Sequence, residues 1–154
     1  MKVSIARRAR TGWQPTAREL AGWASAALGR AAVGRELSVL VAGTVRSRAL
    51  NARYRGRDYA TNVLSFPLPA GVPEDTGLLG ELVICPAVLR REARVQHKPL
   101  RAHWAHMVVH GVLHLVGYDH ERAAQARRME RREIRVLRRL GFDNPYRMNG
   151  RAHG

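Results

Sequence analysis

The segment from His110 to His120 constrains the fold and the chemistry of this chain more than any other stretch. It holds three of the seven histidines, with His110 and His114 four residues apart and His120 six residues further on. Residues four apart on a helix lie one turn above the other on the same face, so both imidazoles can reach one metal ion. Gly117 follows, where a left-handed residue can end the helix. The spacing predicts a metal-bearing helix and a reversal that supplies His120 as a third ligand.

Spacing alone leaves two interpretations of these histidines open. A histidine on an apolar helix is usually packed with a satisfied hydrogen bond, and an i, i+4 pair often has no ligand role. Three histidines around a glycine favour a metal site, and three protein ligands leave one position open on tetrahedral zinc, as in catalytic sites. His106 extends the row but lies about 12 Å from His114 along the helix axis. We therefore expect His106 to be packed, or to orient a ligand from outside the coordination shell.

The hydrophobic pattern of the whole chain predicts an α+β fold with a small sheet. Apolar runs and alternation indicate four strands, at residues 2–6, 36–42, 62–66 and 79–85. Helical spacing indicates five helices, at residues 17–28, 44–54, 86–96, 100–116 and 123–140. Thr16 and Glu19 have the pattern of a capping box before the first helix. The chain has 154 residues and no repeat or linker, so we expect one domain over residues 1–154.

The chain is strongly basic, with 27 Lys and Arg against 12 Asp and Glu and a formal net charge of +15. Most of the positive charge is arginine, whose planar guanidinium matches phosphate oxygens. We expect nucleic acid as the partner; an anionic membrane surface and a merely solvated basic surface are the alternatives. A single cysteine, Cys85, lies in an apolar run, which predicts a buried free thiol. With no secretory signal and no membrane-spanning run, we expect a cytoplasmic protein.

The histidine spacing also matches the H-x-x-x-H-x-x-G-x-x-H pattern of metzincin zinc proteases, apart from one position. Those enzymes place a glutamate directly after the first histidine as the general base, and this chain has Gly111 there. Glycine cannot transfer a proton, which argues against peptide hydrolysis but leaves the metal chemistry intact. Asp119 is a possible replacement carboxylate, although we expect it to bond the backbone of the turn or to orient a histidine.

A second group of polar residues lies at positions 50–67, where three arginines and two tyrosines stand among small polar residues. This composition suits phosphate clamping and base stacking, and it is also typical of an exposed polar loop. Leu50-Asn51, Tyr54-Arg55, Asp58 and residues 61–67 resemble the signature of the YbeY endoribonuclease family, also called rRNA maturation factor. Further matches extend the resemblance over residues 37–146, namely Gly80 to Pro86, His103 to His120, Leu140 to Phe142 and Pro145-Tyr146.

The resemblance implies a single-strand-specific, metal-dependent endoribonuclease that acts in 16S rRNA 3′ end maturation and ribosome quality control. It implies a small mixed sheet with helices and a zincin-like metal helix, holding one zinc ion in a basic cleft. The family's zinc ligands fall on His110, His114 and His120, and the arginine linked to its activity falls on Arg55. We therefore expect Arg55 and the metal-binding His110 to be catalytic. The implied partners are single-stranded RNA, the small ribosomal subunit, ribosomal protein S11 and the Era GTPase.

The chain departs from the family pattern at two places. Position 81 is Glu where many members carry Asp, and residues 121–140 hold eight arginines and three glutamates where relatives are often acidic. The second departure leaves open whether the last helix binds RNA or a protein. Two other functions also remain: a ribosome-assembly factor with a structural zinc, and a metal-dependent peptidase or amidohydrolase, which Gly111 disfavours.

Overall fold

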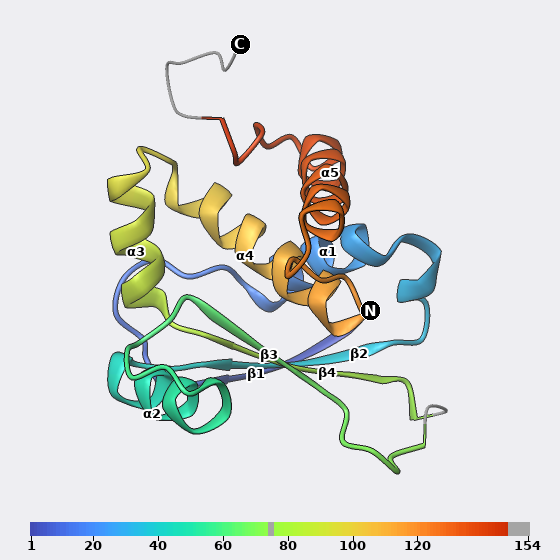
Figure 1. Ribbon diagram of the computed structural model, residues 1–154, viewed down its shortest axis with the longest axis horizontal. Coiled ribbons are helices and arrows are strands. Elements are labelled where there is room, and N and C mark those ends of the chain that lie inside the picture. Colours follow the sequence, from blue (N-terminus) through green and yellow to red (C-terminus); the bar gives the residue numbers. More distant parts are fainter. Residues whose placement is uncertain (74–75, 148–154) are drawn as a thin grey trace.

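The computed structural model describes residues 1–73 and 76–147, which form a mixed four-stranded sheet with helices on both faces (Figure 1). The predicted α+β class is confirmed, and every predicted element lies within one residue of its observed bounds. The strands are β1 (Lys2–Arg7), β2 (Glu36–Val41), β3 (Val63–Pro67) and β4 (Leu78–Ile84). The helices are α1 (Ala17–Leu28), the short 3-10 helix η1 (Gly29–Ala32), α2 (Thr44–Arg55), α3 (Pro86–Val95), α4 (Leu100–Leu115) and α5 (Ala123–Arg139).

The sheet has the strand order β1-β2-β4-β3. The first three strands in this order are parallel, and β3 runs antiparallel to β4 along the edge. Ser65 at the centre of β3 pairs with Leu82 of β4. Pro67 is the last residue of β3, slightly beyond the predicted strand end, which is compatible with an edge strand because proline has no N–H to donate. The edge position leaves one side of β3 free to border a cleft.

The alternation of β2 distributes its side chains over two hydrophobic layers. Val39 and Val41 belong to the main core, which also contains residues of α1, α4 and α5. Leu40 packs into a smaller cluster with Leu64 and Val83, joined by Leu50 of α2. Figure 1 shows the same arrangement, with α2 on one face of the sheet and the other α-helices on the opposite face. The period of two along the strand thus separates the two layers.

Helix α4 lies between the sheet and α5 and is buried along most of its length (Figure 1). Trp104, Val108 and Val112 are fully buried, so the helix axis is fixed by packing on several sides. The helix ends at Leu115, and Gly117 then adopts a φ of 100°, a region that side chains avoid. The positive φ of Gly117 lets the chain reverse its direction toward the sheet. Within the described part of the chain, no helix combines the length and the apolar character needed to cross a membrane.

Candidate metal centre and adjoining cleft

The structure brings His110, His114 and His120 together as a cluster of ring nitrogens. Nε2 of His114 lies 3.2 Å from Nε2 of His110 and 3.1 Å from Nδ1 of His120. Nitrogens held about 2.0–2.1 Å from a tetrahedral zinc ion lie about 3.3 Å from one another. The two measured spacings therefore fit a single ion. His110 and His114 come from successive turns of α4, and His120 comes from the reversal after Gly117.

The Nδ1 atoms of His110 and His114 have hydrogen-bond partners in the protein, and these partners fix the tautomers of the two rings. Nδ1 of His114 lies 3.0 Å from the carbonyl oxygen of Tyr118, and Nδ1 of His110 lies 3.2 Å from the carboxylate of Glu133. Both nitrogens face acceptors and must donate, which leaves the Nε2 lone pairs directed into the cluster. A carboxylate or carbonyl behind a ligating imidazole is the usual support of metal-bound histidine.

The electrostatics of the cluster favour the neutral form of His114, which is the form that binds metal. Burial lowers the pKa of His114, and the neighbouring His110 and His120 lower it further. Protonating His114 would place a charge in a partly buried site beside two other bases. Metal binding requires deprotonated histidine, so this environment holds His114 in its ligand form over a wider pH range.

Glu133 supports the cluster from α5, and our sequence reading assigned it no role. Its carboxylate is fully buried and accepts hydrogen bonds from His106 Nε2 at 2.5 Å, His110 Nδ1 at 3.2 Å and the Tyr146 hydroxyl at 2.8 Å. Burial alone would raise the pKa of Glu133, but the hydrogen bonds to His106 and His110 outweigh burial and lower the pKa to about 2. Glu133 is therefore an anion inside the protein, satisfied by three donors.

His106 lies outside the histidine cluster and is packed in the interior, one of the two arrangements expected for it. Its ring is buried, and burial lowers its pKa. Nε2 donates to Glu133, while Nδ1 has no hydrogen-bond partner, as expected for the neutral tautomer. His106, His110 and Glu133 are close enough to form a second potential metal group. Hydrogen bonds explain why these three side chains lie close together, because His110 directs only its Nδ1 toward Glu133.

Arg55 lies at the end of α2 and is held against β3. One guanidinium nitrogen donates to the carbonyl of Ser65 at 2.9 Å, and the guanidinium carbon lies 5.4 Å from the ring centre of Phe66. The hydroxyl of Ser65 donates to the carbonyl of Gly111 at 3.0 Å. Ser65, on the edge strand, therefore links Arg55 to helix α4.

One cleft of about 590 Å³ contains the arginine and the histidines together. It is bordered by the end of α2, the loop to β3, β3 itself, α4 and the reversal that carries His120. Its charged and polar lining includes Asn51, Arg55, Arg57, Tyr59, Asn62, Ser65, Asp119 and Glu121 beside the three histidines. Asp119 has the turn-bonding role that we expected, since its Oδ1 accepts from the backbone N–H of His120 and of Glu121.

Gly111 faces the sheet at a point where an added side chain would be crowded by two neighbouring side chains. A Cβ at this position would lie 2.8 Å from Leu82 Cδ2 and 3.3 Å from Ser65 Oγ. The glutamate that a metzincin carries here would have to displace the side chain of Leu82, which is fully buried. The close approach of α4 to β3 and β4 thus gives a physical reason for glycine, and the same approach positions His110 beside Ser65.

The fold and the cleft define an α+β protein with a histidine cluster at the end of a buried helix, in a cleft that also contains two arginines. A family model described as Endoribonuclease YbeY matches residues 8–141. An endoribonuclease YbeY from Methylococcus capsulatus is 53% identical over 142 residues, covering 91% of this chain and 92% of the relative. An endoribonuclease YbeY from Halorhodospira halophila is 51% identical over 135 residues, covering 86% of this chain and 88% of the relative. The chain belongs to the endoribonuclease YbeY family.

The fold is also found in a solved structure of low sequence similarity. The solution structure of a protein from Thermotoga maritima is 22% identical to this chain, with a TM-score of 0.55. The match covers 98% of this chain and 99% of that protein. At this identity the likeness establishes the fold of the chain and nothing about its substrate.

Proposed function

We propose that this protein is a zinc-dependent, single-strand-specific endoribonuclease. The observation that carries the proposal is that Arg55 shares one cleft with His110, His114 and His120. The cleft thereby combines a site for a cation with a fixed donor for phosphate oxygens. Membership of the endoribonuclease YbeY family names the same reaction class. The cation and the guanidinium would act on one phosphodiester group of the RNA.

The three histidines would hold the zinc ion as neutral imidazoles, with His110 and His114 oriented by Glu133 and by the Tyr118 carbonyl. When bound in such a site, zinc supplies Lewis-acid polarisation of a phosphate oxygen and activation of water. Three protein ligands leave the open position that this chemistry needs. His110 is then catalytic through the metal, as the family resemblance implies.

Arg55 would bind the scissile phosphate and stabilise the negative charge that grows on it during cleavage. A guanidinium presents two parallel N–H donors, which matches a pair of phosphate oxygens. Its bond to Ser65 and its contact with Phe66 hold it in place before substrate binds, so little reorganisation is required. Arg57 in the same cleft adds positive charge, and the exposed ring of Tyr59 offers a surface on which an unpaired base can stack. This stacking favours single-stranded RNA.

We further propose that the substrate is the 3′ end of 16S rRNA and that the protein acts in ribosome quality control in the cytoplasm. The net charge of +15 supports binding to an RNA-rich partner such as the small ribosomal subunit. Ribosomal protein S11 and the Era GTPase are the protein partners implied by the family resemblance. The buried free thiol of Cys85 is compatible with a reducing compartment.

The test is cleavage of a precursor small-subunit rRNA fragment by highly purified protein, with and without chelator. Arg55→Ala should reduce the cleavage rate by about 100-fold or more, the usual cost of losing a preorganised charge-stabilising donor. Arg53→Ala is the matched control, because Arg53 lies on the same helix but outside the cleft lining. His114→Ala should abolish both metal binding and cleavage. Wild-type rates in Arg55→Ala, or in His114→Ala, would refute the proposal.

A further inference from the structure

The outward face of α5 carries a row of arginines that the proposed cleavage site does not use. Arg128, Arg131, Arg135, Arg138 and Arg139 are exposed. At 3.6 residues per turn they fall within an arc of about 100° and extend over about 16 Å of helix. The opposite face of α5 holds the buried Met129, Glu133, Val136 and Leu137. The helix therefore separates a core face from a strongly basic outer face.

The positive charge of this face is not compensated within the described part of the chain. The ion pairs found there involve Arg48, Arg101 and three histidines, and none involves an arginine of α5. Of the two glutamates in α5, Glu133 is buried and bonded on the inner side, which leaves Glu130 as the exposed acid. A shallow hollow of about 430 Å³ lies between the arginines and is lined by Arg131, Ile134, Arg135, Arg138 and Arg139. Such a face attracts polyanions.

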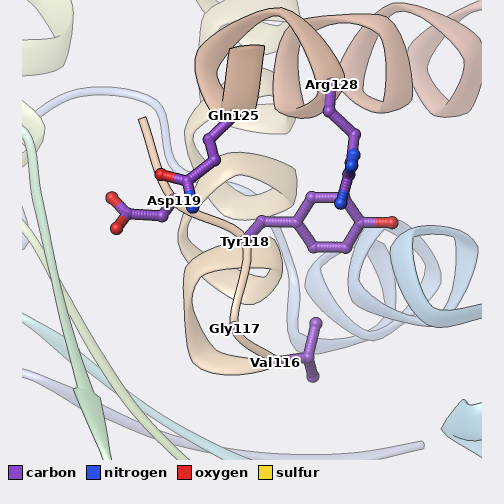
Figure 2. Close-up of a pocket in the computed structure, with 6 residues that line it drawn as sticks. All are labelled: Val116, Gly117, Tyr118, Asp119, Gln125 and Arg128. Carbon is purple, nitrogen blue, oxygen red and sulfur yellow. The ribbon is translucent and has the colours of Figure 1, made fainter. Parts of the chain in front are cut away.

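A small pocket connects this face with the metal cleft. It has a volume of about 210 Å³ and lies between the reversal after α4 and the first turns of α5. Figure 2 shows the side chain of Arg128 extending from α5 toward the ring of Tyr118, with Gln125 extending toward Asp119. Asp119 borders this pocket and also borders the metal cleft. The pocket therefore adjoins the metal cleft at Asp119 and the arginine row at Arg128.

We propose that the pocket and the arginine row form a binding track for the part of an RNA strand that extends beyond the cleavage site. In the pocket, the ring of Tyr118 would stack with one base, Arg128 would bind its phosphate, and Gln125 would donate to the base or the sugar. Arg131, Arg135 and Arg138 would bind the following phosphates. This inference rests on the proposed function, since it assumes an RNA substrate.

Single-stranded RNA fits this surface better than a protein does. An aromatic ring beside successive guanidinium groups is the combination that binds unpaired nucleotides without sequence preference. The row is nearly free of apolar side chains, whereas the fully buried core of a protein interface is usually more apolar than the rest of the surface. Continuity with the cleft through Asp119 lets one strand occupy both sites. Affinity would come from charge and stacking and would fall with salt.

The test is RNA binding measured by fluorescence anisotropy with 2′-O-methyl oligonucleotides, whose integrity is checked after each titration. Two lengths are compared, about 4 and about 16 nucleotides, so that only the longer strand can leave the cleft. The variant is Arg128→Ala/Arg131→Ala/Arg135→Ala, in which alanine preserves helix propensity. The control is Arg8→Ala/Arg10→Ala/Arg30→Ala, which removes the same charge from exposed arginines outside the cleft and the track.

The variant should bind the longer RNA at least about tenfold more weakly than the control does at physiological salt. The slope of log K against log salt should be smaller in magnitude by about 2. Its affinity for the short RNA should match that of the control. Tyr118→Leu should weaken binding of the longer RNA roughly tenfold through loss of stacking, because leucine has no aromatic ring.

Equal affinities and salt slopes for the variant and the control on the longer RNA would overturn the inference. If wild-type protein cleaves unmodified RNA and binds the oligonucleotides in that experiment, only the track fails. If wild-type protein neither binds nor cleaves RNA, the proposed function fails and the track fails with it.

Discussion

Glu133 on α5 accepts a hydrogen bond from Nδ1 of His110 on α4 at 3.2 Å, across 23 positions of sequence. This bond makes the arginine-rich helix part of the candidate metal centre. The inner face of α5 supplies a buried carboxylate that fixes the tautomer of one ligand, while its outer face carries exposed arginines. The Tyr146 hydroxyl, which donates to the same carboxylate, attaches the segment after α5 to this support.

Replacing Glu133 with glutamine should weaken metal binding about 10- to 100-fold, the usual effect of losing a partner behind a ligating histidine. The amide keeps the shape of the side chain but places an N–H₂ group among the donors of His106, His110 and Tyr146. The dissociation constant for zinc is measured by competition with a chromophoric chelator.

Glu92→Gln is the matched control for this variant. Glu92 accepts a hydrogen bond from His103 on the same helix α4, at 2.9 Å, without touching any of the three candidate ligands. The Glu92→Gln substitution should lower the stability of the protein and leave its zinc affinity unchanged. Equal zinc affinities for Glu133→Gln and wild type would show that Glu133 only stabilises the fold.

The sequence predicted the secondary structure closely because local rules govern it here. The capping box of Thr16 and Glu19, for example, is present as predicted. The candidate ligands were also visible in the sequence, because helical spacing and a hinge glycine put them close together. Glu133 was missed because its role depends on the packing of α5 against α4. One signal existed: Glu133 occupies a core position in the repeat Met129, Glu133, Val136, where a charge needs a partner.

The link from Arg55 through Ser65 to Gly111 could not be predicted either. Spacing places Arg55 at a helix end, but only the pairing of β3 at the sheet edge brings the Ser65 carbonyl to the guanidinium and its hydroxyl to α4. Sequence reasoning found the chemical groups. The tertiary structure determines their mutual orientation, which is set by long-range packing of α2, β3 and α4.

Substituting alanine for Gly111 should destabilise the protein by about 1–3 kcal/mol, the typical cost of overpacking a core. The added methyl group would lie 2.8 Å from Leu82 Cδ2, so the buried side chain of Leu82 must shift. Gly22→Ala is the control, because Gly22 lies in α1 with nothing within 4 Å of its Cβ position. It should stabilise the protein by about 0.8–1 kcal/mol. Urea unfolding measures both, and a Gly111→Ala variant as stable as wild type would contradict the close contact.

The hydrogen bonds of Glu92 should make stability depend on pH below its ordinary pKa of 4.5. Burial would raise the pKa of Glu92, but hydrogen bonds from His103 and Asn62 outweigh burial and lower it. A carboxyl whose pKa is lowered on folding stabilises the protein above its unfolded pKa, and this contribution is lost as pH falls through the folded value.

Glu92→Gln should therefore be less stable than wild type by about 1.5 kcal/mol at pH 7, the lower range for a hydrogen bond to a charged group. The difference should shrink as pH falls below 4.5, because the protonated wild-type side chain resembles the amide. Urea unfolding at a series of pH values measures the difference. A difference that stays constant between pH 7 and pH values below 4.5 would rule out this linkage.

Zinc should stabilise the folded protein, because the unfolded chain does not hold its three histidines together. At a free zinc concentration about 100 times the dissociation constant, the free energy of unfolding should rise by about 2.7 kcal/mol. For a chain of this size, that corresponds to an increase in melting temperature of roughly 5–10 °C. His114→Ala should show no increase, because it removes the nitrogen that lies close to both other ligands.

His97→Asn is the control for this measurement. His97 is exposed and lies outside the cleft, and asparagine tolerates its φ of 54°. It should retain the full zinc-dependent increase in melting temperature. An increase of the same size in His114→Ala would place the zinc elsewhere on the protein. The effect is to be measured with and without chelator, since only stabilisation that chelator reverses belongs to the metal.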